Sequence, residues 1–360
     1  MMKILFDIGH PAHVHLFRNI AISLAAQGNE VLFTVREKEC SIPLLQAYKL
    51  PFLKTGKNYH SLSGKIFGLF INELLLFKVA FRFHADIYVS HGSFYAAFVA
   101  FILGKQHIAM EDTGNMEQVR LYLPFTTVVL SPSSFKNKIS KKQLFYNGYH
   151  ELAYLHPEYF SVNNTIENSI GINDNSIIIL LRFIARRATH DIGYSVLSDQ
   201  KKIEIVNYFS AYGKVFVSSE DKLPDDLMKF KLNIPPEKFH YFMNKCSLVF
   251  GNSATVTSEA AMLGIPAIFI DNEGRNYTHE LEEKYGLVFN FKETYSEIDQ
   301  ALVKAAEILK ILDKKKWKIL HEAMLADKIN VTKFLTWFII NFPESHLKMK
   351  NEPAIQWDFK

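Results

Sequence analysis

Short runs rich in Val, Ile and Leu alternate with helical patterns along this chain, and this alternation constrains the fold more than any other feature. In the first half we expect strands at residues 4–8, 30–35, 87–90, 107–110 and 127–130, with helices such as 14–27, 62–83 and 94–103 between them. Apolar strands that alternate with helices are typical of a parallel sheet covered on both faces. The first half is therefore predicted to be an open α/β domain.

A second series of the same kind begins after residue 155. Strands are expected at residues 177–181, 214–218, 248–250, 267–270 and 287–289, followed by two or three helices within residues 295–342. A chain of 360 residues is long enough for two domains. We predict a first domain at residues 1–155, a second at residues 156–342 with its helical tail, and an extension at 343–360. One tail helix could cross back onto the first domain.

Charge and cysteine content exclude several classes of protein. The net charge of +4 is too small for a dedicated nucleic-acid binder, so no nucleic-acid partner is expected. The two cysteines, Cys40 and Cys246, form no C-x-x-C pair, which excludes a disulfide scaffold and a cysteine-based zinc site. Residues 1–7 resemble a strand rather than a signal peptide. We expect a cytoplasmic protein, with a peripheral position on the inner face of the membrane as an alternative.

Open α/β sheets bind ligands beyond the carboxyl ends of their strands, so a cleft between the two domains is expected, and each strand-to-helix loop is a candidate site. The first such loop carries His10, His13 and His15 after Gly9. Imidazole suits a general base at neutral pH, so His13, with His15 second, is the candidate base, and Gly9 and His10 are candidate substrate contacts. No metal is expected, because positions 13 and 15 do not share a helical face. The alternative is helix capping and packing.

The loop after the strand at 248–250 is the candidate diphosphate site. A strand end, small polar residues and a helix start expose free backbone N–H groups, and Glu259, one turn later, could accept both hydroxyls of a ribose. In the alternative, Ser253 or Thr255 only caps the helix and Glu259 is solvated. The residues predicted to bind substrate here are Gly251, Asn252, Ser253, Ala254, Thr255 and Glu259.

The loop after the strand at 177–181 contains Arg182, Arg186 and His190. Guanidinium groups supply the paired donors that a phosphate needs, so this loop is a second candidate for donor binding. A solvated basic face is the alternative.

Two further loops in the first domain carry polar residues at strand ends. His91 and Ser93 follow one strand as substrate-binding candidates, and Glu111 and Asp112 follow the next as candidate bases or orienting acceptors. In the alternative, Asp112 only shapes a turn. A run of lysines beside apolar residues could meet an anionic membrane, although such runs are usually only solvated. That run comprises Lys136, Lys138, Lys141 and Lys142, next to Leu144, Phe145 and Tyr146.

Segments 7–17, 181–193 and 258–267 resemble the domain-of-unknown-function family 354, which is related to GT-B glycosyltransferases and UDP-GlcNAc 2-epimerases. The resemblance covers nearly the whole chain. It implies two Rossmann-like domains, the second holding a nucleotide diphosphate sugar and the first an acceptor. By this resemblance Glu259 matches the ribose-binding Glu of GT-B enzymes, 253–255 match their diphosphate loop, and His13 or His15 falls where several transferases keep a base.

The resemblance to the epimerases is less complete. His91-Gly92-Ser93 resembles their His-Gly-Asp, with Ser93 in place of the aspartate, and Glu111 resembles the carboxylate of their Glu-Ala-Gly. The arginine usual in the epimerases' first loop is missing, which argues against epimerisation.

We therefore expect a GT-B-type glycosyltransferase that moves a sugar from a nucleotide diphosphate donor, taken to be a UDP-sugar, to a glycan or lipid-linked acceptor. No tightly bound cofactor or metal is expected. Arg182, Arg186 and the helix start at 253–255 would stabilise the leaving diphosphate. The alternatives are an enzyme like the UDP-GlcNAc 2-epimerases and a non-catalytic nucleotide-sugar-binding protein.

Overall fold

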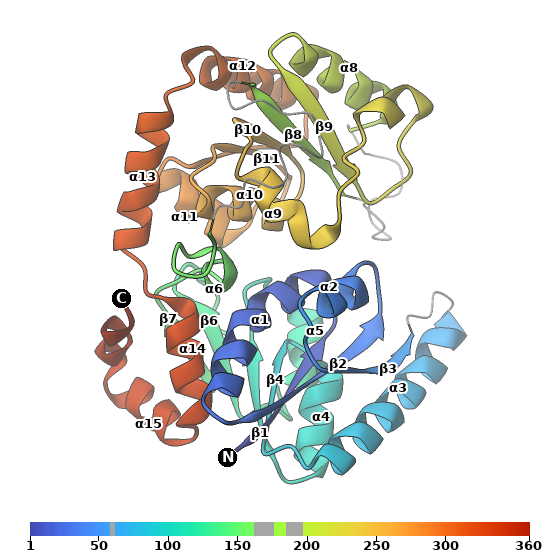
Figure 1. The fold of residues 1–360 in the computed structure, drawn as a ribbon, viewed down its shortest axis with the longest axis vertical. Coiled ribbons are helices and arrows are strands. Elements are labelled where there is room, and N and C mark those ends of the chain that lie inside the picture. The colour runs from blue at the N-terminus through green and yellow to red at the C-terminus, as the bar shows by residue number, and fades with distance from the viewer. Residues whose placement is uncertain (58–61, 162–175, 185–196) are drawn as a thin grey trace. The chain divides into compact units, whose positions relative to one another are not determined.

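The structure is a computed structural model that describes residues 1–57, 62–161, 176–184 and 197–360 (Figure 1). The chain divides into two compact units. Unit 1 comprises Met1–Tyr159 together with Lys328–Lys360, and unit 2 comprises Phe160–Asp327. Each unit is built on one parallel sheet, as the alternation of apolar strands and helices predicts.

The sheet of unit 1 has seven parallel strands in the order β3-β2-β1-β4-β5-β6-β7. The order reverses between β1 and β4, and β1 and β4 are buried along nearly their whole length. Such a reversal is where open α/β sheets bind ligands. The strands are β1 (Lys3–Ile8), β2 (Glu30–Glu37), β3 (Phe52–Lys57), β4 (Ile87–His91), β5 (Gln106–Met110), β6 (Val128–Pro132) and β7 (Gln143–Tyr146).

Two of these strands, β3 and β7, are absent from the expected set. Both lie at an edge of the sheet, where each has one neighbouring strand. Edge strands bury less side chain than central strands, so the polar sequence of β3 and the short run of β7 produce no apolar pattern.

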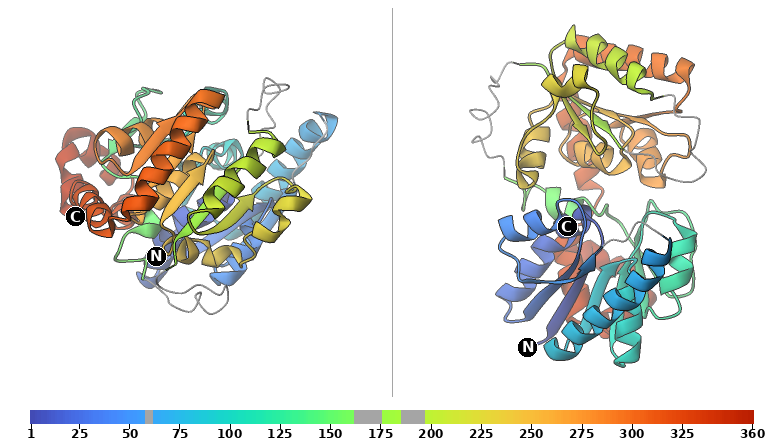
Figure 2. Two further views of the ribbon diagram at one scale, coloured as in Figure 1. Left: turned by 90° about the horizontal axis from the view of Figure 1, so that it is seen from above. Right: turned by 90° about the vertical axis from the view of Figure 1, so that its right-hand side faces the viewer.

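Helices cover both faces of this sheet (Figure 2). One group is α3 (Leu62–Phe83), α4 (Phe94–Ile102) and α5 (Met116–Tyr122), which pack side by side. The other is formed around α1 (Pro11–Ala26), which contacts α2 (Ser41–Ala47) and α6 (Leu152–Leu155).

The C-terminal residues return to unit 1, as predicted for one tail helix. Helix α14 (Val331–Ile340) packs on α1 and α6, and the Thr332 hydroxyl donates to the carbonyl of Ala153 (2.6 Å). α15 (Glu344–Asn351) and the 3₁₀ helix η4 (Pro353–Phe359) follow it. Residues 328–342 therefore lie in unit 1, whereas the sequence placed them in the second domain. The apolar face of α14, including Phe334 against Tyr146 (5.6 Å between ring centroids), is buried there.

Unit 2 contains a five-stranded parallel sheet in the order β12-β11-β10-β8-β9. The strands are β8 (Ile178–Phe183), β9 (Lys214–Ser219), β10 (Leu248–Gly251), β11 (Ala267–Ile270) and β12 (Val288–Phe291). The α-helices of the described part are α8 (Asp199–Ser210), α9 (Phe239–Met243), α10 (Ala254–Met262), α11 (Asn276–Glu283), α12 (Tyr295–Ile311) and α13 (Lys314–Ala326). Within the described ranges, no helix combines the length and the apolar character needed to cross a bilayer.

Candidate active site

The loop between β1 and α1 places His10, and the first turn of α1 places His13, at the carboxyl edge of the unit 1 sheet. His10 caps α1, because its Nδ1 accepts a hydrogen bond from the amide of Ala12 (3.2 Å). The amide of Gly9 donates to Nδ1 of His13 (3.3 Å). Burial, together with the neighbouring His91, His10 and Arg36, holds the pKa of His13 well below its usual range. His13 is therefore a neutral imidazole at pH 7.

His15 does not join His13. Its ring stacks on Tyr154 (5.3 Å between centroids), and the Tyr48 hydroxyl lies 3.3 Å from its Nδ1. Two residues along a helix correspond to about 200°, so the two side chains leave α1 in nearly opposite directions. The structure thus places His15 in packing between α1, α2 and α6, while its predicted catalytic role stays a prediction.

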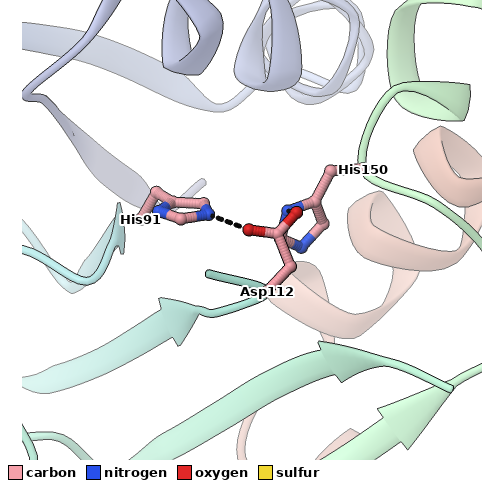
Figure 3. Close-up of side chains that lie close together, drawn as sticks. All are labelled: His91, Asp112 and His150. Atoms are coloured by element: carbon pink, nitrogen blue, oxygen red, sulfur yellow. Dashed lines mark hydrogen bonds and ion pairs between the residues drawn. The ribbon is translucent and has the colours of Figure 1, made fainter. Parts of the chain in front are cut away.

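The most distinctive cluster of unit 1 joins three loops that follow parallel strands (Figure 3). One oxygen of the Asp112 carboxylate lies 3.0 Å from Nε2 of His91, and the other lies 3.0 Å from Nδ1 of His150. Asp112 follows β5, His91 ends β4 and His150 follows β7. A single carboxylate therefore bridges two imidazoles at the carboxyl edge of the sheet.

The charges of this cluster stabilise one another. Burial would raise the pKa of Asp112, but His150 and His91 outweigh it and hold that pKa well below its usual range. Burial opposes the charged form of His91, yet the hydrogen bond and charge of Asp112 raise its pKa on balance. His13 stacks on His91 with ring centroids 4.7 Å apart. Nε2 of His150 is buried, and no residue in the described ranges forms a hydrogen bond with it. The cluster thus combines a carboxylate, a readily charged imidazole and an unused ring nitrogen, which are the groups that proton transfer needs.

The same three residues could hold a metal ion. Among the described residues, His91, Asp112 and His150 offer ligand atoms that all lie within 4.8 Å of one another. Because each carboxylate oxygen already pairs with a different imidazole, one ion would have to replace both hydrogen bonds. The present geometry is that of a hydrogen-bonded relay.

The Glu111 carboxylate stabilises the loop that follows β5 through hydrogen bonds. One carboxylate oxygen accepts hydrogen bonds from the amide and hydroxyl of Thr113 and from the amide of Gly114 (2.6–3.1 Å), and the other accepts from the Tyr122 hydroxyl (2.9 Å). The carboxylate is buried, and four donors occupy it. A role as base would require Glu111 to give up these bonds, so the geometry favours Asp112 among the two predicted carboxylates.

Ser93 is part of a network that sequence reasoning did not identify. Its hydroxyl caps α4 and lies 2.6 Å from Oδ2 of Asp7, which also accepts a hydrogen bond from Arg36 (3.2 Å). A Cβ atom at Gly9 would lie 2.9 Å from Nη2 of Arg36, so glycine gives the guanidinium its room. The sequence feature that could have revealed this network is Asp7, a carboxylate within a mostly apolar strand. No comparable feature in the sequence marked His150 or Arg36 as a site residue.

In unit 2, β10 and α10 are joined by the short polar loop that the sequence predicts, and its role in anion binding stays a prediction. The Ser253 hydroxyl caps α10 by accepting from the amide of Val256 (3.4 Å), and the Asn252 side chain accepts from the amide of Ile184 (2.8 Å). The amides of Ala254 and Thr255 lie in the first turn, where a helix provides no backbone partner. A Cβ atom at Gly251 would lie 1.9 Å from the carbonyl oxygen of Arg182, so β10 and β8 can approach only because position 251 is glycine.

Glu259 is not the solvated side chain of the alternative interpretation. It is 3% exposed, and its carboxylate lies 2.9 Å from Nε2 of His240 on α9. His240 is a further residue that the sequence analysis missed, because His240 and Glu259 are 19 positions apart in the chain and only the fold brings them together. The pair could hold the carboxylate in one orientation for a ribose.

The arginine loop is only partly described. Arg182 donates to the Ser218 hydroxyl (3.0 Å) and to the Glu220 carboxylate (2.8 Å), so its guanidinium is engaged within unit 2. Arg186 and His190 lie outside the described residues.

In the lysine-rich segment expected to meet a membrane, Lys136, Lys138 and Lys141 are exposed, and Lys142 is tied to the fold. Lys142 donates to the carbonyls of Leu123 and Thr126 (3.0 and 2.6 Å), and Tyr146 is fully buried. Phe145, at 39% exposure, is the large apolar side chain that this segment offers to solvent.

Comparison with known proteins agrees with this architecture. Residues 2–276 match the model of a family described as "Protein of unknown function (DUF354)". No curated protein matches the sequence significantly.

Solved structures match nearly the whole chain at low identity. A UDP-N-acetylglucosamine 2-epimerase homologue from Listeria monocytogenes is 14% identical and superposes with a TM-score of 0.68 over 98% of this chain and 97% of that one. MnaA of S. aureus, solved with UDP, is 15% identical, with a TM-score of 0.70 over 97% and 98%. Spinosyn forosaminyltransferase SpnP is 13% identical, with a TM-score of 0.62 over 93% and 97%. The chain therefore has the α/β fold with two Rossmann-like sheets that GT-B glycosyltransferases and these epimerases share.

Proposed function

The chain belongs to the DUF354 family, and we propose that it is a GT-B-type glycosyltransferase that transfers a sugar from a UDP-sugar to a glycan or lipid-linked acceptor. One observation carries the proposal: unit 2 pairs a capped helix start at Ser253 with a buried carboxylate, Glu259, one to two turns further along the same helix. Such a helix start attracts a diphosphate, and a carboxylate at this spacing suits a ribose.

The donor would bind through backbone groups and two side chains. The amides of Ala254 and Thr255 would face the diphosphate, and the positive end of the α10 dipole would stabilise the charge that develops on the leaving group. Glu259, oriented by His240, would accept the ribose hydroxyls. Glycosyl transfer would then need no bound metal ion to balance the diphosphate charge.

Proton transfer from the acceptor hydroxyl would use the cluster of unit 1. His13 is neutral and would take the proton at Nδ1, giving up the hydrogen bond from the Gly9 amide (3.3 Å), while the nearby Asp112 carboxylate favours the charged form of this ring. Asp112 would remain ionised and hold His91 and His150 in place through its two hydrogen bonds. Asp112 would act on His13 through its charge and through the His91 ring that stacks on His13.

Calorimetry with nucleoside diphosphates tests the donor half of the proposal. We expect UDP to bind, and no binding of any nucleoside diphosphate at millimolar concentration would contradict the proposal. Turnover is then measured with radiolabelled UDP-sugars, with and without an acceptor fraction. Activity should survive dialysis against EDTA, with metal analysis of the dialysed enzyme as the control.

Epimerisation is the second candidate, because the epimerase homologue from Listeria monocytogenes superposes with a higher TM-score (0.68) than the transferase SpnP (0.62). The same assay separates the two activities. An epimerase converts the donor with no acceptor present, whereas a transferase requires one. Binding without any turnover would instead support a nucleotide-sugar-binding protein.

A further inference from the structure

Helix α3 carries large apolar side chains on a face that unit 1 leaves open. Phe70, Leu74 and Phe81 are 64%, 69% and 57% exposed. Their spacing of four and seven residues places them on one side of the helix, within about 40° of one another. A surface helix normally turns its apolar side chains towards the core, so an exposed row of this kind indicates a binding surface.

The neighbouring helix extends this surface. Phe101 and Ile102, at the end of α4, are 59% and 52% exposed. α3 and α4 are packed together through a shared core that includes Leu76 and Val99, and they run side by side in Figure 1. We name Phe70, Leu74, Phe81 and Ile102 together the α3–α4 apolar surface, and leave out Phe101 because its ring lies against Phe125 (5.3 Å between centroids), on the side of α4 that faces α5.

The exposed charged side chains on these two helices are positive. Lys78 and Arg82 are exposed on α3, whereas the one acid in the α3 sequence, Glu73, has both carboxyl oxygens buried. Burial, together with the charge of Asp7, raises the pKa of Glu73 to about 8, so it is mostly uncharged at pH 7. The α4 sequence contains no charged residue. The apolar surface is thus accompanied by positive charge without an exposed acid on either helix.

We propose that the α3–α4 apolar surface docks the protein on an anionic lipid bilayer. Apolar side chains enter the boundary between head groups and acyl chains, and lysine and arginine beside them are attracted to anionic lipids. A symmetric contact between two copies is less favourable, because it would bring Lys78 and Arg82 towards their own copies with no acid on α3 or α4 to pair with them. This inference is independent of the proposed sugar chemistry.

Co-sedimentation with vesicles tests the proposal. The full chain is mixed with phosphatidylcholine vesicles that contain either no phosphatidylglycerol or about 30% of it. We expect binding to the anionic vesicles, weaker binding without phosphatidylglycerol, and a loss of binding as salt is raised. The double variant Phe70→Ser/Leu74→Ser should reduce the partition coefficient by about ten-fold or more. Ile311→Ser/Ile319→Ser is the matched control, because these side chains of unit 2 are 73% and 55% exposed.

A charge variant gives a second, independent measurement. Lys78→Gln/Arg82→Gln should remove most of the preference for anionic vesicles, whereas Lys314→Gln/Lys315→Gln in unit 2 should not. The proposal is overturned if the wild-type protein does not bind anionic vesicles or if both α3 variants bind as it does. It is also overturned if sedimentation equilibrium shows a dimer that Leu74→Ser dissociates. Thermal unfolding of each variant reports on folding and UDP titration reports on the donor site, so that a failure here is distinct from a failure of the proposed function.

Discussion

The carboxylate of Asp112 lies 3.0 Å from Nε2 of His91, although a helix and a strand separate the two residues in the chain. This contact fixes the end of β4 against the loop after β5, and it keeps a negative charge and a chargeable imidazole at the carboxyl edge of the sheet. Open α/β sheets bind their ligands at this edge, so the pair connects the fold directly to the proposed chemistry.

Asp112→Asn should lower kcat by about 10²- to 10⁴-fold and leave UDP affinity nearly unchanged, because the amide keeps the shape but loses the charge that supports both imidazoles. The measurement is kcat alongside calorimetric Kd for UDP. Without Asp112 the pKa of His91 falls, which NMR titration of the imidazole would detect. Unaltered turnover in a folded Asp112→Asn protein would assign the cluster to structure alone.

His13→Ala and His15→Ala should have opposite effects. We expect His13→Ala to reduce kcat with little change in melting temperature, because its ring lies on His91 at the edge of the sheet. His15→Ala should lower the melting temperature and leave kcat of the folded fraction near normal, since its ring packs between Tyr48 and Tyr154. Thermal unfolding and steady-state kinetics on both variants decide the matter. The reverse pattern would transfer the catalytic role to His15.

Glu259→Gln should weaken the binding of UDP more than the binding of inorganic pyrophosphate, because only UDP has a ribose for the carboxylate to bind. His240→Phe should show the same selectivity in milder form, since it removes the group that orients Glu259 without removing the carboxylate. Calorimetry with both ligands measures the difference. Equal losses for UDP and pyrophosphate would exclude Glu259 from ribose recognition.

Buried His107 should make the protein less stable in acid. Burial lowers the pKa of His107 to about 3, and its two ring nitrogens pair with the hydroxyls of Ser90 and Thr126 (2.8 and 2.9 Å). An unfolded histidine binds its proton near pH 6.5, so between about 6.5 and 3 the unfolded chain holds more protons and stability falls as pH falls. The full contribution, at most roughly 5 kcal/mol, is present above pH 6.5.

Urea unfolding of wild type and His107→Gln between pH 4 and 8 checks this prediction. The variant is expected to be less stable at pH 8 but to lose less free energy of unfolding on acidification. Parallel pH profiles for the two proteins would mean that other groups cause the acid sensitivity.

Local sequence patterns were sufficient to predict both parallel sheets, apart from the edge strands β3 and β7, and the loops at the ends of the predicted strands. Alternation of apolar strands with helices reports burial on two faces, and the run from Gly251 to Glu259 is a contiguous strand, loop and helix. These features depend on neighbours a few residues apart, and periodicity encodes such neighbours directly.

Contacts between distant residues were decided by the tertiary structure. His150 reaches Asp112 because β7 runs parallel to β5 in the same sheet with only β6 between them, and His240 reaches Glu259 because the fold brings α9 to α10. Residues 328–360 join unit 1 because the apolar face of α14 is buried on α1 and α6. The apolar pattern of a segment shows that one of its faces must be buried against another element, but it does not identify that element. Sheet order and helix packing depend on the burial of apolar surface over the whole chain.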